Sequence, residues 1–234
     1  MVKGDPNDPT SWPPSSATTL CLGLDIGMAQ DHSALIAAGA WQSGARSVIG
    51  AFSVKQFALG TPLDEVADAT AEIARYLKCR TVFDASNNSA FASILAARFG
   101  ANPANALVAG VITNAADHAS QPTPMMLSLM GQRSTIPRWT LSKRELIESV
   151  SAEIDSGMLK IGRTGDWEAL REELTGMERT VRESGSVAYS APAGKHDDLV
   201  LALALAVFGL RRVGAPARVR RHKRNAAPSV LAWT

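Results

Sequence analysis

Cysteine and histidine are scarce in this chain of 234 residues. The two cysteines, Cys21 and Cys79, each lie near the start of a predicted strand and have no second cysteine close in sequence. We therefore expect reduced thiols in the core, because disulfides and metal pairs need a suitably spaced partner. The four histidines show no spacing typical of zinc. The sequence thus argues against zinc-binding and disulfide-stabilised protein classes.

Long apolar runs and nucleotide-binding loops are also missing. No apolar run approaches the roughly 18 residues that a membrane span requires, and the N-terminus has no basic stretch followed by an apolar one. We therefore expect a soluble, cytoplasmic protein without a membrane partner. The chain also has no Gly-x-x-x-x-Gly-Lys-Ser/Thr loop, which argues against a P-loop ATPase motor within it.

Positive charge is concentrated at the C-terminal end. The chain carries +2 overall, but residues 211–234 hold seven Lys and Arg and no acidic residue, so residues 1–210 have 17 basic against 22 acidic residues, or −5. We expect one folded domain over residues 20–213. Residues 1–19, rich in Pro, Ser and Asp, should form a disordered leader or linker. The basic tail, residues 214–234, suits phosphate contacts, or else solubilises the chain or docks a partner.

Hydrophobic periodicity predicts an α/β fold with a five-stranded mixed sheet. The first three strands should form an antiparallel meander, and helix-strand units should follow it. A right-handed crossover puts the fourth strand beside the first, at the centre of the sheet. The predicted strands cover residues 20–27, 33–41, 47–57, 79–84 and 106–113, and the predicted helices between them cover residues 62–78 and 87–99.

The second half of the chain is less regular. Residues 114–138 contain Pro, Ser and several Met, and we predict a long loop that forms a flap over the core. An amphipathic helix is predicted over residues 141–154. Residues 180–192 are predicted to form a hairpin that turns at Ser184 and Gly185.

Acidic residues occur in two predicted strands and at the start of the most apolar helix. Asp25 stands inside the apolar run of the first strand, so it should lie at an exposed strand end, pair with a cation or be a tolerated structural defect. Asp84 ends the neighbouring fourth strand, so both carboxylates should lie at one edge of the sheet. Steps of three and four from Asp198 reach mostly small residues, which would let that helix approach the sheet closely. We therefore expect Asp198 to face the sheet, with Asp197 beside it. A helix cap followed by an exposed aspartate is the alternative.

Several carboxylates at one edge need positive charge to offset their repulsion. An oxygen-only ligand set, without His or Cys, favours Mg²⁺ or Mn²⁺. The sequence therefore predicts a divalent metal site built from positions 25, 84 and 197 or 198.

Five segments of the chain carry a resemblance to a known family, and they are Gly23–Gly27, Val82–Asp84, Ser142–Leu146, Gly157–Ile161 and His196–Ala204. They occur in the order seen in the nuclease domain of phage terminase large subunits. The sequence resembles that domain over roughly residues 20–212. The resemblance implies a ribonuclease H-like fold related to Holliday-junction resolvases.

The resemblance also implies an activity, cofactors and partners. It implies an endonuclease, phage or prophage encoded, that cuts concatemeric double-stranded DNA in a bacterial host during genome packaging. A packaging motor ATPase, a portal or a small terminase subunit would be its protein partner. By the same resemblance, Asp25 bridges two Mg²⁺ or Mn²⁺ ions, Asp84 holds one of them, and Asp198 or Asp197 holds the other. Such ions activate water for attack on the phosphodiester and stabilise the leaving oxygen.

Other polar residues are candidates for supporting roles. Basic residues that open the helix near residue 143 oppose its dipole, so they suit a phosphate contact as well as an ordinary solvated face. The pair Asp31 and His32 also fits a plain polar turn. The DNA-contact candidates are Lys143, Arg144, Arg182 and Lys195, and the accessory candidates at the metal site are Asp31 and His196.

Several alternatives stay open. A junction resolvase on the same fold would cut four-way junctions symmetrically as a dimer. The run Leu24–Gly27 also resembles the first phosphate loop of actin-like phosphotransferases, but that fold needs a duplicated domain. A non-enzymatic packaging adaptor is a further alternative. The sequence fits either a nuclease domain that is separated from its motor or a chain that is encoded alone.

Overall fold

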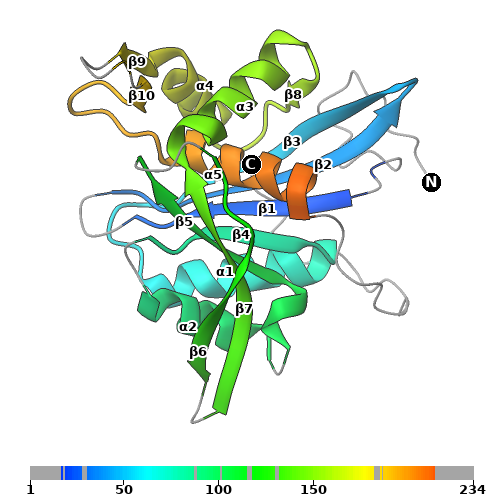
Figure 1. Cartoon of the computed structure of the whole chain (residues 1–234), viewed down its shortest axis with the longest axis vertical. Coiled ribbons are helices and arrows are strands. Elements are labelled where there is room, and N and C mark those ends of the chain that lie inside the picture. Colours follow the sequence, from blue (N-terminus) through cyan, green and yellow to red (C-terminus); the bar gives the residue numbers. More distant parts are fainter. Residues whose placement is uncertain are drawn as a thin grey trace.

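A mixed sheet of eight strands runs through the protein, and helices cover both of its faces (Figure 1). The computed structural model describes residues 17, 19–27, 31–86, 89–100, 102–114, 118–129, 132–181, 185 and 187–213. The expected basic tail, residues 214–234, and nearly all of the expected leader, residues 1–19, lie outside these ranges. Within them, no helix is both long and apolar enough to cross a membrane.

The sheet has the strand order β6-β7-β5-β4-β1-β2-β3-β8, and β9 and β10 form a separate hairpin. The strands are β1 (Thr19–Asp25), β2 (Ala34–Ser43), β3 (Arg46–Gln56), β4 (Arg80–Asp84), β5 (Leu107–Thr113), β6 (Thr123–Leu129), β7 (Gln132–Ser142), β8 (Leu159–Ile161), β9 (Glu178–Val181) and β10 (Val187–Ser190). The helices are α1 (Leu63–Leu77), α2 (Ser89–Arg98), the 3₁₀ turn η2 (Pro103–Asn105), α3 (Lys143–Asp155), α4 (Trp167–Gly176), α5 (Asp198–Phe208) and the π-turn η3 (Gly209–Val213).

The predicted centre of the sheet is confirmed. β1, β2 and β3 form an antiparallel meander, and β4 lies parallel to β1 on its other side. The five predicted strands correspond to β1 to β5, each within a few residues of its predicted ends. The predicted hairpin near residue 185 is confirmed as well, since β9 and β10 pair antiparallel.

The prediction of five strands is wrong, because the sheet has eight. Residues 114–138, predicted as a loop, include β6 and most of β7, which pair antiparallel and extend the sheet beyond β5. Two of the three prolines in this segment, Pro124 and Pro137, lie opposite each other in the hairpin of β6 and β7. Pro137 precedes the first residue of β7 that pairs with β5. Its lack of an amide N–H therefore costs no hydrogen bond to β5. The eighth strand, β8, pairs with β3 at the other edge.

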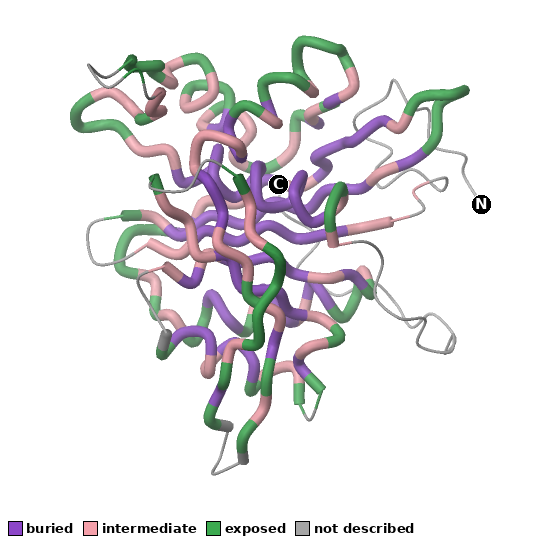
Figure 2. The backbone as a smooth tube through the Cα atoms, in the orientation of Figure 1, coloured by how far each residue is buried: buried purple, intermediate pink, exposed green. Residues whose placement is uncertain are grey.

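Each face of the sheet has its own apolar core. One core gathers side chains of α3, α4 and α5, and the other gathers side chains of α1 and α2. Successive strand residues point to opposite faces, so Cys21 joins the first core, whereas Leu22 and Leu24 join the second. Both cysteines are free and buried, as predicted. Figure 2 shows the central strands and α5 as the most continuously buried part of the chain.

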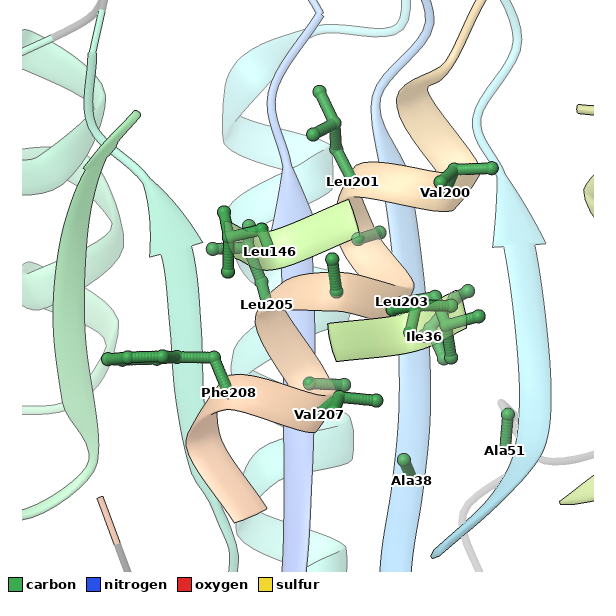
Figure 3. Packing of buried hydrophobic residues seen from close by; sticks show 14 of the residues in the cluster. Ile36, Ala38, Ala51, Leu146, Val200, Leu201, Leu203, Leu205, Val207 and Phe208 are labelled. Carbon is green, nitrogen blue, oxygen red and sulfur yellow. The ribbon is translucent and has the colours of Figure 1, made fainter. Parts of the chain in front are cut away.

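Helix α5 lies directly on β1 and β2 (Figure 3). A Cβ atom at Gly23 of β1 would lie 1.9 Å from the Ala202 carbonyl oxygen, so only glycine lets the helix backbone come this close. Near the other end of the contact, a Cβ atom at Gly209 would meet the Cys21 sulfur. The helix therefore runs opposite to β1, and its first turn meets the C-terminal end of the strand.

This contact gives a test of how the helix is held. We expect Gly23→Ala to lower the free energy of unfolding by about 3 kcal/mol, because the added methyl meets helix backbone and only a shift of α5 can relieve the clash. Gly110→Ala in β5 is the matched control, since its methyl would meet mainly the flexible Leu141 side chain. Urea unfolding of both variants measures the difference. Equal losses of stability would show that backbone contact at Gly23 has no special weight.

Candidate active site

Two aspartates lie side by side at the C-terminal ends of the central strands. β1 and β4 are parallel and pair up to Leu24 and Phe83, so the next residues, Asp25 and Asp84, are neighbours. By the alternation of the strands, both face the side of the sheet that α5 covers. Asp25 is only 6% exposed.

The first turn of α5 brings two more carboxylates to the same edge. Asp198, the first residue of the helix, is 7% exposed, and its Oδ2 accepts a hydrogen bond from the His32 amide at 3.2 Å. Asp197, the N-cap residue, turns instead to Lys143, whose Nζ lies 2.7 Å from its Oδ2. The more buried member of the pair is therefore Asp198.

The carboxylates raise one another's pKa. Burial raises the pKa of Asp25 well above its usual value, and the negative charges of Asp84, Asp198 and Asp197 raise it further. Burial also raises the pKa of Asp84, which hydrogen bonds from Ser86 partly oppose. For Asp198, burial and the charges of Asp31 and Asp197 raise the pKa to about 6, against the effect of His196. Burial is thus the largest effect at all three residues, and repulsion between carboxylates adds to it at Asp25 and Asp198.

Several of these carboxylates accept hydrogen bonds from different groups of the protein. Asp84 accepts hydrogen bonds from the amide and hydroxyl of Ser86, and Asp197 binds Lys143. As they stand, no three His, Cys, Asp or Glu side chains in the described ranges are grouped closely enough to enclose a metal ion. Binding of an ion would therefore require these side chains to turn toward one another.

The accessory candidates lie beside Asp198. His196 Nδ1 is 3.8 Å from Asp198 Oδ2 and 3.6 Å from Asp31 Oδ1. The ring of His32 packs edge-on against that of His196, and His32 Nδ1 lies 2.8 Å from the Phe57 carbonyl. Asp31 and His196 are both more than a third exposed. They form the open side of the carboxylate cluster.

The basic candidates differ in their surroundings. Lys143, at the start of α3, is mostly buried against Asp197 and also lowers the pKa of Asp84, so it acts as an internal counter-charge. Arg144 reaches Glu148 at 4.0 Å, and Lys195 is exposed just before α5. Arg182, which follows β9 in the sequence, lies outside the described residues.

Sequence reasoning missed Glu173 of α4. Its Oε2 accepts hydrogen bonds from the amides of Leu199 at 2.9 Å and Val200 at 3.1 Å, in the first turn of α5. Burial and the charges of Asp198 and Asp197 raise its pKa to about 7, although the two amides lower it. No spacing in the sequence points to this contact, because α4 and α5 belong to separate segments of the chain.

The mixed sheet, with its strand order and with helices on both faces, has the ribonuclease H-like α/β fold. Solved structures of terminase nuclease domains match the chain across this fold. No protein-family model and no curated protein sequence matches it.

Three of these structures illustrate the likeness. The large terminase nuclease of thermophilic phage G20c, with bound magnesium, has a TM-score of 0.51 at 18% identity and covers 81% of this chain and 80% of its own. The nuclease domain from Thermus phage P74-26 has a TM-score of 0.50 at 17% identity, with coverages of 82% and 79%. The human cytomegalovirus terminase nuclease domain, soaked with Mn and inhibitor bound, has a TM-score of 0.55 at 15% identity, with coverages of 84% and 85%. The predicted resemblance to terminase nuclease domains is confirmed at the level of the fold.

The raised pKa values predict an unusual pH dependence of stability. The folded protein holds protons on Asp25, Asp198 and Glu173 more tightly than the unfolded chain does, so stability falls as pH rises from the ordinary carboxyl pKa through the folded values of about 6 and 7. We expect the thermal midpoint in EDTA to be lower at pH 8 than at pH 5.

A substitution checks the cause of this effect. Asp25→Asn should raise the midpoint at pH 8 and flatten the pH dependence, because it removes the charge that the other carboxylates repel. Asp68→Asn is the control, since Asp68 is exposed and pairs with Arg98 away from the site. A wild-type midpoint that stays level or rises between pH 5 and pH 8 in EDTA would contradict the account.

Proposed function

We propose that this protein is a metal-dependent endonuclease that cuts viral DNA during genome packaging. The observation that carries the proposal is the gathering of Asp25, Asp84 and Asp198, from three separate elements, at one edge of a ribonuclease H-like sheet. The fold shared with the magnesium-bound phage G20c nuclease and the Mn-soaked cytomegalovirus domain supports it. Acting in packaging, it would work with a motor ATPase, a portal or a small terminase subunit.

The donor set fits Mg²⁺ or Mn²⁺. Carboxylate oxygens are the hard ligands that these ions prefer, and bound cations would stabilise the charged forms of Asp25, Asp84 and Asp198, whose pKa values burial raises. These three residues would hold two ions, with Asp197 as an additional carboxylate on α5. When bound, the ions would activate water and offset the charge that develops on the phosphate.

The protein's own contribution is to hold repelling carboxylates close together. The parallel pairing of β1 with β4 fixes Asp25 beside Asp84, and the packing of α5 on Gly23 brings Asp198 to the same edge. Because Asp25 and Asp198 are largely shielded from water, their negative charges would attract bound cations with little screening. Lys143 limits the net charge by pairing with Asp197.

Phosphate contacts are assigned to basic residues near this edge. β7 runs parallel to β5, so the start of α3 after β7 lies at the same edge as Asp25 and Asp84. Arg144 in the first turn of α3 and Lys195 before α5 would meet the DNA backbone, and Arg182 and the basic tail, which lie outside the described residues, would add contacts. Lys143 would reach a phosphate only by leaving Asp197.

Plasmid cleavage tests the proposal. Purified protein should nick or linearise plasmid DNA with Mg²⁺ or Mn²⁺, with little sequence preference, and EDTA should stop the reaction. Asp25→Ala and Asp198→Ala should each lower the rate by more than about 100-fold, because the remaining carboxylates cannot hold both ions.

The control separates loss of chemistry from loss of folding. Asp68→Ala removes an exposed carboxylate on the α1 side of the sheet and should cleave at the wild-type rate. Circular dichroism should show all three variants folded. Cleavage that persists in EDTA, or that survives Asp25→Ala, would refute the metal mechanism.

A further inference from the structure

The first turn of α5 exposes backbone amides that need an acceptor. An α-helix leaves its first amides without partners inside the helix, and the N-cap side chain usually accepts from the second or third of them. In α5 these two amides belong to Leu199 and Val200. The same turn carries Asp198, so the way these amides are satisfied decides how firmly that carboxylate is held.

The N-cap residue of α5 does not accept hydrogen bonds from these two amides. Asp197 makes no capping hydrogen bond with its side chain. Its carboxylate turns away to bind Lys143 at 2.7 Å, and that of Asp198 binds the His32 amide. Both aspartates of the turn are therefore committed to the site, which leaves the amides of Leu199 and Val200 to another acceptor.

Glu173 supplies that acceptor from a different helix. Its Oε2 lies 2.9 Å from the Leu199 nitrogen and 3.1 Å from the Val200 nitrogen, so one oxygen satisfies both amides. A negative charge at this end of the helix also complements the helix dipole. These favourable interactions are opposed by electrostatic repulsion, because the Glu173 carboxylate lies close to the charges of Asp198 and Asp197.

Helix α4 is anchored so that Glu173 stays in this place. Before the helix, the Asp166 amide donates to the Val54 carbonyl at 3.0 Å, and its Oδ2 accepts from the Gln56 amide at 2.6 Å. Gly165, with φ of +58°, has no room for a side chain against the Val54 carbonyl. Leu170 is fully buried in the core beneath α5. These contacts tie α4 to the end of β3 at one end and to α5 at the other.

We propose that Glu173 is a positioning residue that caps α5 from outside and thereby holds Asp198 in place for metal binding. The inference rests on the proposed function, and it adds a residue that touches neither metal nor DNA. Residues that orient metal ligands commonly change metal affinity by 10-fold to 100-fold when they are removed. Glu173 thus lets Asp197 and Asp198 serve the site without leaving the helix end uncapped.

The experiment compares four proteins: wild type, Glu173→Ala, Glu173→Gln and Glu172→Ala. Amide hydrogen exchange in EDTA reports on the cap itself, and calorimetric titration with Mn²⁺ reports on the metal site. Glu173→Ala should speed exchange at Leu199 and Val200 by about 10-fold or more and weaken Mn²⁺ binding by about 10-fold. Glu173→Gln keeps an acceptor oxygen, so it should stay within about 3-fold of wild type in both measurements.

The remaining variants make the outcomes separable. Glu172→Ala removes the same charge from an exposed neighbour in α4 and should match wild type in both measurements. If Glu173→Ala does not fold, Glu173→Asp, which keeps the charge on a shorter side chain, takes its place. Wild-type exchange rates and wild-type Mn²⁺ affinity in the alanine or aspartate variant would overturn the proposal. A wild-type protein that neither binds Mn²⁺ nor cuts DNA would instead refute the proposed function, while the exchange rates would still show whether Glu173 caps α5.

Discussion

The contact of α5 with β1 at Gly23 is the constraint on which the site depends. A strand and a helix usually keep the distance that their side chains impose, but here the helix carbonyl of Ala202 occupies the place of a Cβ atom. Because the helix runs opposite to the strand, this close approach brings its first turn to the strand end that carries Asp25. The same apolar core that fixes α5 therefore decides how near Asp198 comes to Asp25 and Asp84.

The resulting cluster of buried carboxylates costs the folded protein stability at neutral pH. Burial raises the pKa of Asp25, Asp84, Asp198 and Glu173, and the charges of neighbouring carboxylates raise it further at all of them except Asp84. Three donors partly offset the cost of the buried carboxylates. The Ser86 amide donates to Asp84, the Lys143 ammonium group to Asp197 and the His32 amide to Asp198. A site that costs stability at neutral pH is typical of a site kept for function.

Much of this arrangement could be predicted from the sequence, because it depends on local pattern. Strand periodicity predicted the neighbouring strands that carry Asp25 and Asp84, and the small residues of α5 indicated its close packing. The β6–β7 hairpin escaped prediction because Pro124 and Pro137 suggest a loop, and only the pairing register shows that both are tolerated. Glu173 and the Lys143–Asp197 pair escaped because both join segments far apart in the chain, a relation that no periodicity records.

The central claim is that Asp25, Asp84 and Asp198 converge on shared divalent cations. Anomalous diffraction from crystals soaked in Mn²⁺ tests it most directly, because the scattering locates the ions without reference to activity. The account predicts two anomalous peaks at the edge of the sheet where β1 and β4 end, each within bonding distance of Asp25. Peaks confined to other parts of the surface, or bound by Asp31 and His196 without Asp25, would contradict it.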